Sequence, residues 1–291
     1  MTAPPAAGLP AVQEETGYPE HPPRMGFFTD TSVCIGCKAC EVACKEWNRL
    51  PADAPFELTA MSFDNTGQLS GSTWRHVAFI EQRKPVRAPQ APGGRPSGDQ
   101  GAGDLRWLMA SDVCKHCTDA ACLNVCPTGS LFRTEFGTVV VQEDVCNGCG
   151  YCVSACPYGV IDKREDDGRV FKCTLCYDRL GDGLVPACAK ACPTESIQFG
   201  PVDELLERAE ARLRSLHRDG VQDARLYGED PEDGVRGNGA FFLLLDEPEV
   251  YGLPPAPMDP TRDLPSMWRH AAAAAAALVC GVAAAFLTAR R

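Results

Sequence analysis

The sequence has 291 residues and a formal charge of −11, because acidic side chains outnumber basic ones. This charge does not suit binding to nucleic acid or to an anionic membrane surface, both of which are themselves negative. The length provides for two small domains or for one elaborated domain, and the 17 cysteines are the feature of the composition that points to a chemistry.

Residues 1–24 are rich in Pro and Ala and lack the apolar core of a secretory signal peptide. We therefore predict a disordered N-terminal arm, and assembly of the chain in the cytoplasm, where thiols stay reduced. Export would then require the folded state and a partner that carries the signal. Residues 26–30, GFFTD, predict a short strand that leads into the first group of cysteines.

The first group has the spacing C-x2-C-x2-C-x3-C, which is the bacterial ferredoxin pattern for a 4Fe–4S cluster. Its members are Cys34, Cys37, Cys40 and Cys44. After it, residues 74–80 alternate as a strand does, whereas residues 83–104 are rich in Pro and Gly and predict a surface loop or a disordered insertion.

The second group has one longer gap and ends in C-x3-C-P. It consists of Cys114, Cys117, Cys122 and Cys126. Residues 131–133 and 138–142 then predict a hairpin. A cluster loop, a short helix and a hairpin in this order make the ferredoxin arrangement, so the predicted fold class is α+β.

The third group, CNGCGYCVSACP at residues 146–157, has the strongest pattern in the sequence, with the regular spacing and the final proline. Its cysteines are Cys146, Cys149, Cys152 and Cys156. Gly148 and Gly150 allow the backbone to approach the sulfur atoms closely. In this pattern the fourth cysteine ligates the other cluster of a pair, so each group requires a partner group.

The fourth group has a long central loop and the same C-x3-C-P ending, and a short strand is predicted after it at residues 197–199. It consists of Cys173, Cys176, Cys188 and Cys192. Sixteen of the 17 cysteines thus form four groups of four, which predicts four 4Fe–4S clusters. The remaining one, Cys280, is expected to be a small packing residue.

Zinc sites and disulfides are alternative uses of paired cysteines. Zinc sites usually combine two CxxC units across a loop, without runs of four that end in C-x3-C-P. Disulfides between cysteines three apart would be strained, and a chain of this size does not need them. Iron–sulfur clusters are therefore favoured, and an assay of iron and sulfide distinguishes them from zinc.

In the ferredoxin pattern the fourth cysteine of each group ligates the cluster of the partner group. We call this the crossing rule, and it predicts which cysteines share a cluster. The second and third groups are neighbours in the sequence, and the first and fourth would pair around them. The predicted ligand sets are Cys34, Cys37, Cys40 and Cys192 (set 1); Cys173, Cys176, Cys188 and Cys44 (set 2); Cys114, Cys117, Cys122 and Cys156 (set 3); and Cys146, Cys149, Cys152 and Cys126 (set 4).

We accordingly expect two ferredoxin-like modules with two clusters each. The first comprises residues 25–110 together with 161–200, and the second comprises residues 111–160. Residues 201–265 form an extension that would wrap the body or a partner. It contains an amphipathic helix, predicted from Pro201 to Arg218 with Gly220 as C-cap, that packs on the body, and an apolar strand at 240–245.

Residues 271–289 carry no charge, and as a helix they would be about 28 Å long, enough to cross a hydrocarbon core. We predict a single membrane anchor over residues 266–291, in which small residues suit close packing against other membrane helices. Because 11 of these 19 uncharged residues are Ala, a soluble alanine-rich helix is the alternative. The two arginines at 290–291 favour an extracytoplasmic body by the positive-inside tendency, and arginines at the near end oppose that argument.

The sequence at residues 34–48, 113–161 and 172–200 resembles the iron–sulfur (beta) subunit of respiratory formate dehydrogenases. The segments KHCTDAAC and RTEFGTVVVQ carry the resemblance, and FFLLLDEPEVYGLP at 241–254 and the terminal helix agree with it. The pattern of four groups alone is shared with electron-transfer subunits of nitrate, dimethyl sulfoxide and polysulfide reductases and of some hydrogenases.

The resemblance implies a redox subunit without a catalytic site or a small-molecule substrate of its own. Electrons would enter from a molybdenum- or tungsten-pterin catalytic (alpha) subunit that oxidises formate, and would leave to a cytochrome b membrane (gamma) subunit and quinone. It also implies an extracytoplasmic body exported with the catalytic subunit, with the cytoplasmic face as the alternative. A stand-alone enzyme is the rival class, but no nucleotide fingerprint, nucleophile elbow or HExxH helix is found.

Five lysines adjoin predicted ligands, namely Lys38, Lys45, Lys115, Lys172 and Lys190. They either raise the cluster potentials by stabilising the more negative reduced state, or are solvated surface residues. His116 is expected to be a surface residue rather than a ligand, because the cysteine count is already complete.

Overall fold

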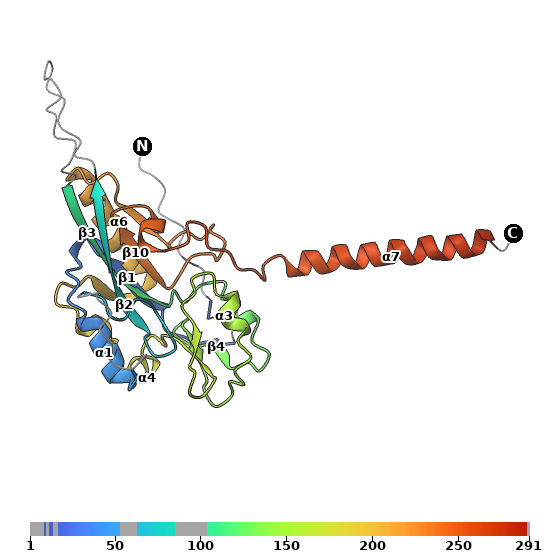
Figure 1. Ribbon diagram of the computed structural model, residues 1–291, viewed down its shortest axis with the longest axis horizontal. Helices are drawn as coiled ribbons and strands as arrows, with labels where there is room; N and C mark the ends of the chain where they lie inside the picture. Colours follow the sequence, from blue (N-terminus) through green and yellow to red (C-terminus); the bar gives the residue numbers. More distant parts are fainter. Residues whose placement is uncertain (1–8, 10–11, 14–16, 53–62, 85–103, 290–291) are drawn as a thin grey trace, which may run out of the picture.

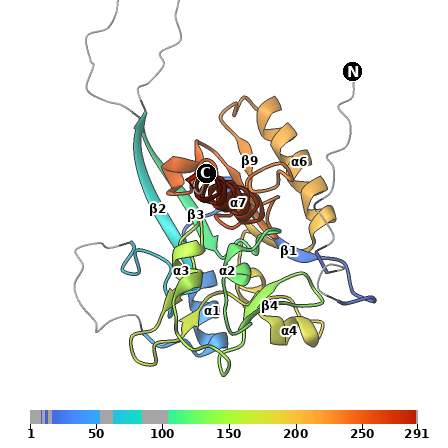
Figure 2. The same ribbon diagram turned by 90° about the vertical axis from the view of Figure 1, so that its right-hand side faces the viewer.

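The computed structural model describes residues 9, 12–13, 17–52, 63–84 and 104–289. The protein forms a mixed α/β body, from which one long helix, α7 (Leu264–Ala289), extends away (Figure 1). Viewed along this helix, α2 (Ala121–Asn124) and α3 (Tyr151–Ala155) lie in one region of the body, and α6 (Val202–Arg218) lies in another (Figure 2).

A four-stranded sheet forms the centre of the body, in the order β8-β1-β10-β9. Its strands are β1 (Met25–Asp30), β8 (Ile197–Pro201), β9 (Arg225–Tyr227) and β10 (Ala240–Leu244). Strand β1 pairs in parallel with β10 and antiparallel with β8. All five residues of β10 are buried, as expected for an apolar strand covered on both faces. The strands predicted at 26–30, 197–199 and 240–245 are thereby confirmed.

Helix α6 packs against this sheet, as its amphipathic pattern predicts. Its buried residues include Leu205, Leu206, Ala209 and Leu216, which share a cluster with Phe28 and Phe241 of the sheet. The rings of Phe28 and Phe241 stack at 5.6 Å between centroids. The helix begins directly after Pro201 and its C-cap is Asp219, so the predicted cap Gly220, at φ +90°, lies one residue farther on.

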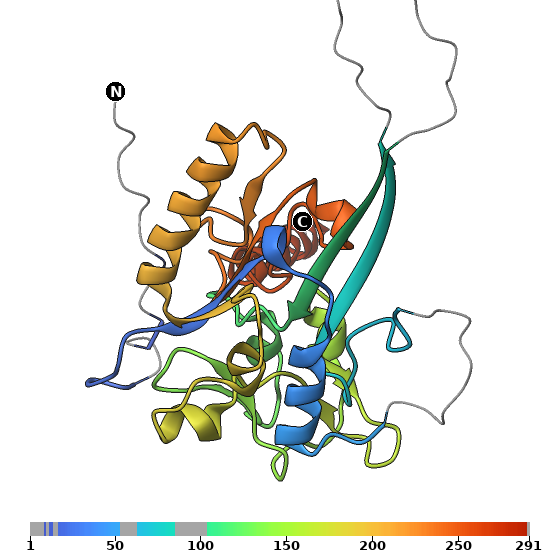
Figure 3. The same cartoon turned by 90° about the vertical axis from the view of Figure 1, so that its left-hand side faces the viewer.

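Strands β2 (Arg75–Lys84) and β3 (Asp104–Val113) form a long antiparallel ribbon at one side of the body (Figure 3). Their register runs from Arg75 opposite Val113 to Lys84 opposite Asp104. Residues 83, 84 and 104, predicted as loop, therefore belong to strands. The rest of that predicted loop lies outside the described residues.

The remaining elements are short, and most of them lie next to the cysteines in the sequence. They are η2 (Thr31–Val33), α1 (Ala39–Asn48), β4 (Leu131–Arg133), β5 (Val139–Val141), β6 (Asp162–Lys163), β7 (Val170–Phe171), α4 (Tyr177–Gly181), α5 (Ala187–Lys190) and η3 (Pro248–Tyr251). Strands β4 and β5 pair antiparallel, which confirms the predicted hairpin.

Several described residues within the segment 1–24, which is predicted to be a disordered arm, pack on the body, while residues 17, 19, 20 and 23 are exposed. Leu9, Val12 and Gln13 are buried. Leu9 contacts Gly237 so closely that a Cβ there would lie 2.3 Å from its Cδ2 atom. Arg24 donates hydrogen bonds to Thr118 Oγ1 at 2.9 Å and to a main-chain carbonyl at 3.1 Å. The apolar side chains of this Pro/Ala-rich segment thus fit against surfaces of the body, and composition alone does not reveal such contacts.

Helix α7 is long and apolar enough to cross a membrane. Residues Leu264–Thr288 have a mean hydropathy of 2.1 in their most apolar window, and none of that window is buried in the body. This agrees with the predicted anchor by length and composition.

Candidate metal centres

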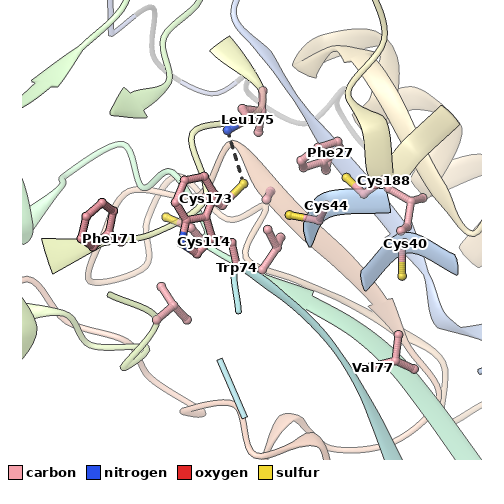
Figure 4. Packing of buried hydrophobic residues seen from close by; sticks show 14 of the residues in the cluster. Phe27, Cys40, Cys44, Trp74, Val77, Cys114, Phe171, Cys173, Leu175 and Cys188 are labelled. Carbon is pink, nitrogen blue, oxygen red and sulfur yellow. Dashed lines mark hydrogen bonds between the residues drawn. The ribbon is translucent and has the colours of Figure 1, made fainter. Parts of the chain in front are cut away.

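The four cysteine loops share one backbone feature. The residue immediately before the second cysteine of each group has a positive φ: Gly36 at +65°, His116 at +47°, Gly148 at +70° and Leu175 at +56°. At Gly148 a side chain is excluded as well, because a Cβ would lie 2.4 Å from the carbonyl oxygen of Gly168. In the fourth loop this turn directs the Leu175 N–H to Cys173 Sγ at 3.3 Å (Figure 4). The fourth loop is thus shaped to direct a backbone N–H group toward sulfur.

Two of the cysteine sets line cavities. One cavity is lined by Cys34, Cys37, Cys40 and Cys192. A second is lined by Cys114, Cys117, Cys122 and Cys156. In each case three thiols come from one group and the fourth comes from another, which is the juxtaposition that the crossing rule predicts for sets 1 and 3.

In the other two sets, burial and neighbouring cysteines raise the pKa values of Cys44 and Cys152. Burial raises the pKa of Cys44 far above its usual range, and Cys173, Cys188 and Cys176 raise it further. Burial likewise raises the pKa of Cys152 to about 11, with contributions from Cys149, Cys126 and Cys146. The thiols named for set 2, and those named for set 4, therefore lie close enough together to interact, and their grouping around one cluster each stays a prediction.

Helix α1 shows how one short element serves two sets. Cys40 and Cys44 lie four residues apart on it, but their sulfur atoms point in different directions (Figure 4). Cys40 Sγ lies 3.2 Å from Ser111 Oγ on β3, whereas Cys44 points toward Cys173. One turn of helix therefore separates the two sites.

The chemistry of these donors suits a cationic cofactor. All seventeen cysteines are free of disulfide bonds. Burial raises the pKa of Cys40 to about 11 and that of Cys122 to about 12, so a thiolate at either position requires compensating positive charge. The iron of a cluster supplies that charge, and a 4Fe–4S cluster takes four thiolates, the number in each set. Within the described residues, no three His, Cys, Asp or Glu side chains converge as the ligands of a single ion would.

Comparisons with known proteins identify the cofactor. A family model described as a 4Fe-4S dicluster domain matches residues 33–130, and a second model with the same description matches residues 105–202. Two such domains provide four 4Fe–4S clusters, as predicted from the cysteine count.

The similar curated proteins identify the family. The formate dehydrogenase iron-sulfur subunit of Haemophilus influenzae is 37% identical over 267 residues, which cover 90% of this chain and 78% of the relative. The nitrate-inducible formate dehydrogenase iron-sulfur subunit of Escherichia coli is 39% identical, with coverage of 85% and 78%. The protein belongs to the family of formate dehydrogenase iron–sulfur subunits. A component of the anaerobic dimethyl sulfoxide reductase of Escherichia coli is 37% identical over 64% of this sequence and 77% of its own length.

As an iron–sulfur subunit, the protein is a non-catalytic, electron-transferring part of an oxidoreductase complex. Its cysteine sets form a row. Burial is the largest cause of the raised pKa in Cys40, Cys173 and Cys122, and a cysteine of the neighbouring set adds to it in each case. That cysteine is Cys188 for Cys40, Cys114 for Cys173 and Cys152 for Cys122. These pairs join set 1 to set 2, set 2 to set 3, and set 3 to set 4.

The two ends of the row reach the surface of the subunit. Cys37 in set 1 and Cys149 in set 4 are exposed, whereas every cysteine of sets 2 and 3 is buried or half-buried. The inner sites are thus shielded from water, and the outer sites are accessible to partners.

The lysines beside the cysteines divide into two classes. Lys115 and Lys172 are buried, at 1% and 2% exposure, while Lys38 and Lys45 are half-buried and Lys190 is exposed. Lys172 lines the cavity of set 3. The interpretation as a solvated surface residue therefore fits only Lys190 among the five lysines.

The expectation that His116 lies on the surface is wrong, because its exposure is 1%. The left-handed turn in its loop directs it inward, where its Nδ1 accepts a hydrogen bond from the Val139 N–H at 3.1 Å. Burial lowers its pKa well below the usual range, and the positive charge of Lys172 adds to the effect. His116 is therefore a neutral buried side chain.

Sequence reasoning missed Arg75, whose guanidinium donates to Cys188 Sγ at 3.4 Å. It also missed Ser111, which contacts Cys40. The available signal was the charge of Arg75 within the strand pattern of residues 74–80, since a charge is seldom buried without a partner.

Proposed function

We propose that this iron–sulfur subunit receives electrons from a molybdenum- or tungsten-pterin catalytic subunit that oxidises formate, and delivers them to a cytochrome b membrane subunit and then to quinone. The observation that carries the proposal is the row of four cysteine sets with an exposed cysteine at each end. One end is accessible to a donor and the other to an acceptor. When bound, 4Fe–4S clusters supply one-electron carriers between them.

We also propose sets 1 to 4 as the ligands of the four clusters, within modules at residues 25–110 with 161–200 and at residues 111–160. The protein's own contribution is to hold thiolates in groups of four, to exclude water from the inner sites and to direct N–H groups at sulfur. These contacts and the buried cations adjust the potential of each site.

We further propose that α7 anchors the subunit in the membrane beside the cytochrome, with the body on the extracytoplasmic face. The proposal is supported by the length and hydropathy of α7 and by the arginines at its far end. Sidedness is measured by fusing a reporter to the C-terminus that is active on one side of the membrane only. The proposed orientation places the C-terminus in the cytoplasm, so a reporter that is active outside the cytoplasm would contradict it.

The similarity to a dimethyl sulfoxide reductase component makes a sister reductase the second candidate function. To distinguish them, the tagged subunit is purified anaerobically from detergent-solubilised native membranes, and the proteins that co-elute are identified. Formate-dependent dye reduction together with pterin-containing and haem b subunits is the expected result. The same partners with dimethyl-sulfoxide-dependent oxidation of a reduced dye, and no formate activity, would transfer the subunit to a reductase.

A further inference from the structure

Arg75 on β2 is a buried charge between two cysteine sets. Its exposure is 1%, and its Nη2 donates to Cys188 Sγ of set 2 at 3.4 Å. Its Nη1 donates to Ser111 Oγ at 3.2 Å and to the Ser111 carbonyl at 3.3 Å. Ser111 Oγ in turn lies 3.2 Å from Cys40 Sγ of set 1. A continuous series of polar contacts therefore connects the two sets through one guanidinium.

The direction of these hydrogen bonds follows from the chemistry of the groups. A guanidinium only donates, so Ser111 Oγ accepts from Arg75 and keeps its own proton. A cysteine that ligates iron is a thiolate and only accepts. The Ser111 hydroxyl therefore donates to Cys40 Sγ, and the cation strengthens that bond by polarising it.

A charge at this depth requires compensation. An arginine side chain is not deprotonated in proteins, so the buried guanidinium is a cation beside Cys188 Sγ. The face of the Phe27 ring, 4.8 Å from the guanidinium carbon, adds a cation–π contact. The Nε atom has no hydrogen-bond partner among the described residues. The principal counter-charge of Arg75 is thus the cysteine sulfur of two sites.

We propose that Arg75 is a positioning residue that acts through Cys188 and Ser111 to stabilise the reduced state of the clusters in sets 1 and 2 together. Reduction adds negative charge to a cluster, and a fixed cation nearby favours the more negative state. Because this guanidinium contacts set 2 directly and set 1 through Ser111, it raises the potentials of two neighbouring sites. The inference rests on the proposed ligand sets.

The test compares Arg75→Met, Arg75→Lys and a matched control, each in the complete complex purified anaerobically from membranes. The control is Arg106→Met, which removes an arginine of the same ribbon that donates to Asp246 at 2.6 Å and contacts no cysteine among the described residues. Midpoint potentials of the four clusters are measured by redox titration followed by electron paramagnetic resonance. The variants Cys40→Ser and Cys188→Ser assign the paramagnetic signals of sets 1 and 2 independently. If the proposed ligand sets are wrong, the spectra of these cysteine variants show it, and the arginine variants are not needed to detect it.

For Arg75→Met we expect the reduced-to-oxidised ratio of the clusters in sets 1 and 2 to fall at least tenfold at a fixed potential, equivalent to about 59 mV for a one-electron couple. Sets 3 and 4 should not shift. Arg75→Lys keeps the charge and should keep most of the potential, whereas Arg106→Met should shift none. Full cluster content with unchanged potentials in Arg75→Met, or an equal shift of all four clusters, would overturn the proposal.

Should Arg75→Met lose its clusters, Ser111→Ala becomes decisive, because it keeps the cation and removes only the hydroxyl that contacts Cys40. A fall in potential confined to set 1 would support the proposal. An unchanged set 1 would refute the role of this contact.

Discussion

The ammonium of Lys172 donates a hydrogen bond to the carbonyl oxygen of Cys173 at 2.9 Å, with 2% of the lysine exposed. Lys172 also donates to the Val139 carbonyl and lines the cavity of set 3, whereas Cys173 belongs to set 2. One buried cation thus lies between sets 2 and 3, as Arg75 lies between sets 1 and 2. Such cations offset the negative charge that accumulates when neighbouring clusters are reduced.

Replacing Lys172 by Met should therefore lower the potential of the set 3 cluster, and that of the set 2 cluster less. We expect about a tenfold fall in the reduced-to-oxidised ratio at a fixed potential, about 59 mV, since the removed charge is buried and poorly screened. Redox titration followed by electron paramagnetic resonance measures it. Lys190→Met, which removes an exposed lysine near a cysteine of the same group, is the control and should change little. Equal shifts in both variants would attribute the effect to overall charge.

The crossing of ligands predicts a reciprocal pair of defects. Cys156→Ala should disturb the cluster of the second cysteine group, because Cys156 lines that cavity, although it belongs to the third group in sequence. Cys126→Ala should disturb the cluster of the third group. The iron content of each variant and its paramagnetic spectrum give the answer. A loss in Cys156→Ala confined to the third group would show that the ligands do not cross.

Helix α6 provides a test of stability that is separate from the clusters. Leu205 of this helix is fully buried, whereas Leu213 of the same helix is only half-buried. Leu205→Ala should cost about 2–5 kcal/mol through lost burial and the cavity left behind, and Leu213→Ala should cost less. Thermal unfolding of the purified complex, scanned at one rate for all variants, checks the ranking. Because α6 contributes no predicted ligand, cluster content before heating should be normal in both variants.

The sequence was most informative where chemistry fixes spacing. The intervals between cysteines were sufficient to predict four clusters, and the crossing rule anticipated that Cys40 and Cys44 would face different sites. The apolar run that became β10 was equally clear, since a strand covered on both faces is continuously apolar.

Other features depended on contacts that a local pattern does not contain. His116 resembles a surface residue by composition, but a left-handed turn directs it inward. Arg75 is buried beside Cys188, which lies far from it in the sequence, and it reaches Cys40 only through Ser111. The N-terminal segment lacks periodicity, and its burial depends on glycine surfaces far along the sequence, such as Gly237.

Helix α7 permits the last prediction, which concerns membrane attachment. Its large apolar side chains, among them Leu278 at 70% exposure and Phe286 at 69%, have no partner in the body that the structure describes, and alanine contributes little to partitioning. A charge at the helix centre costs about 2.5–3.5 kcal/mol of insertion free energy, and a charge near the end costs less because it reaches the interface. Leu278→Arg should therefore release much of the subunit from carbonate-washed membranes, whereas Ser266→Arg should not. If the Leu278→Arg variant stays with the membrane to the same extent as the Ser266→Arg control, attachment depends on contacts of the body with other subunits rather than on insertion of α7.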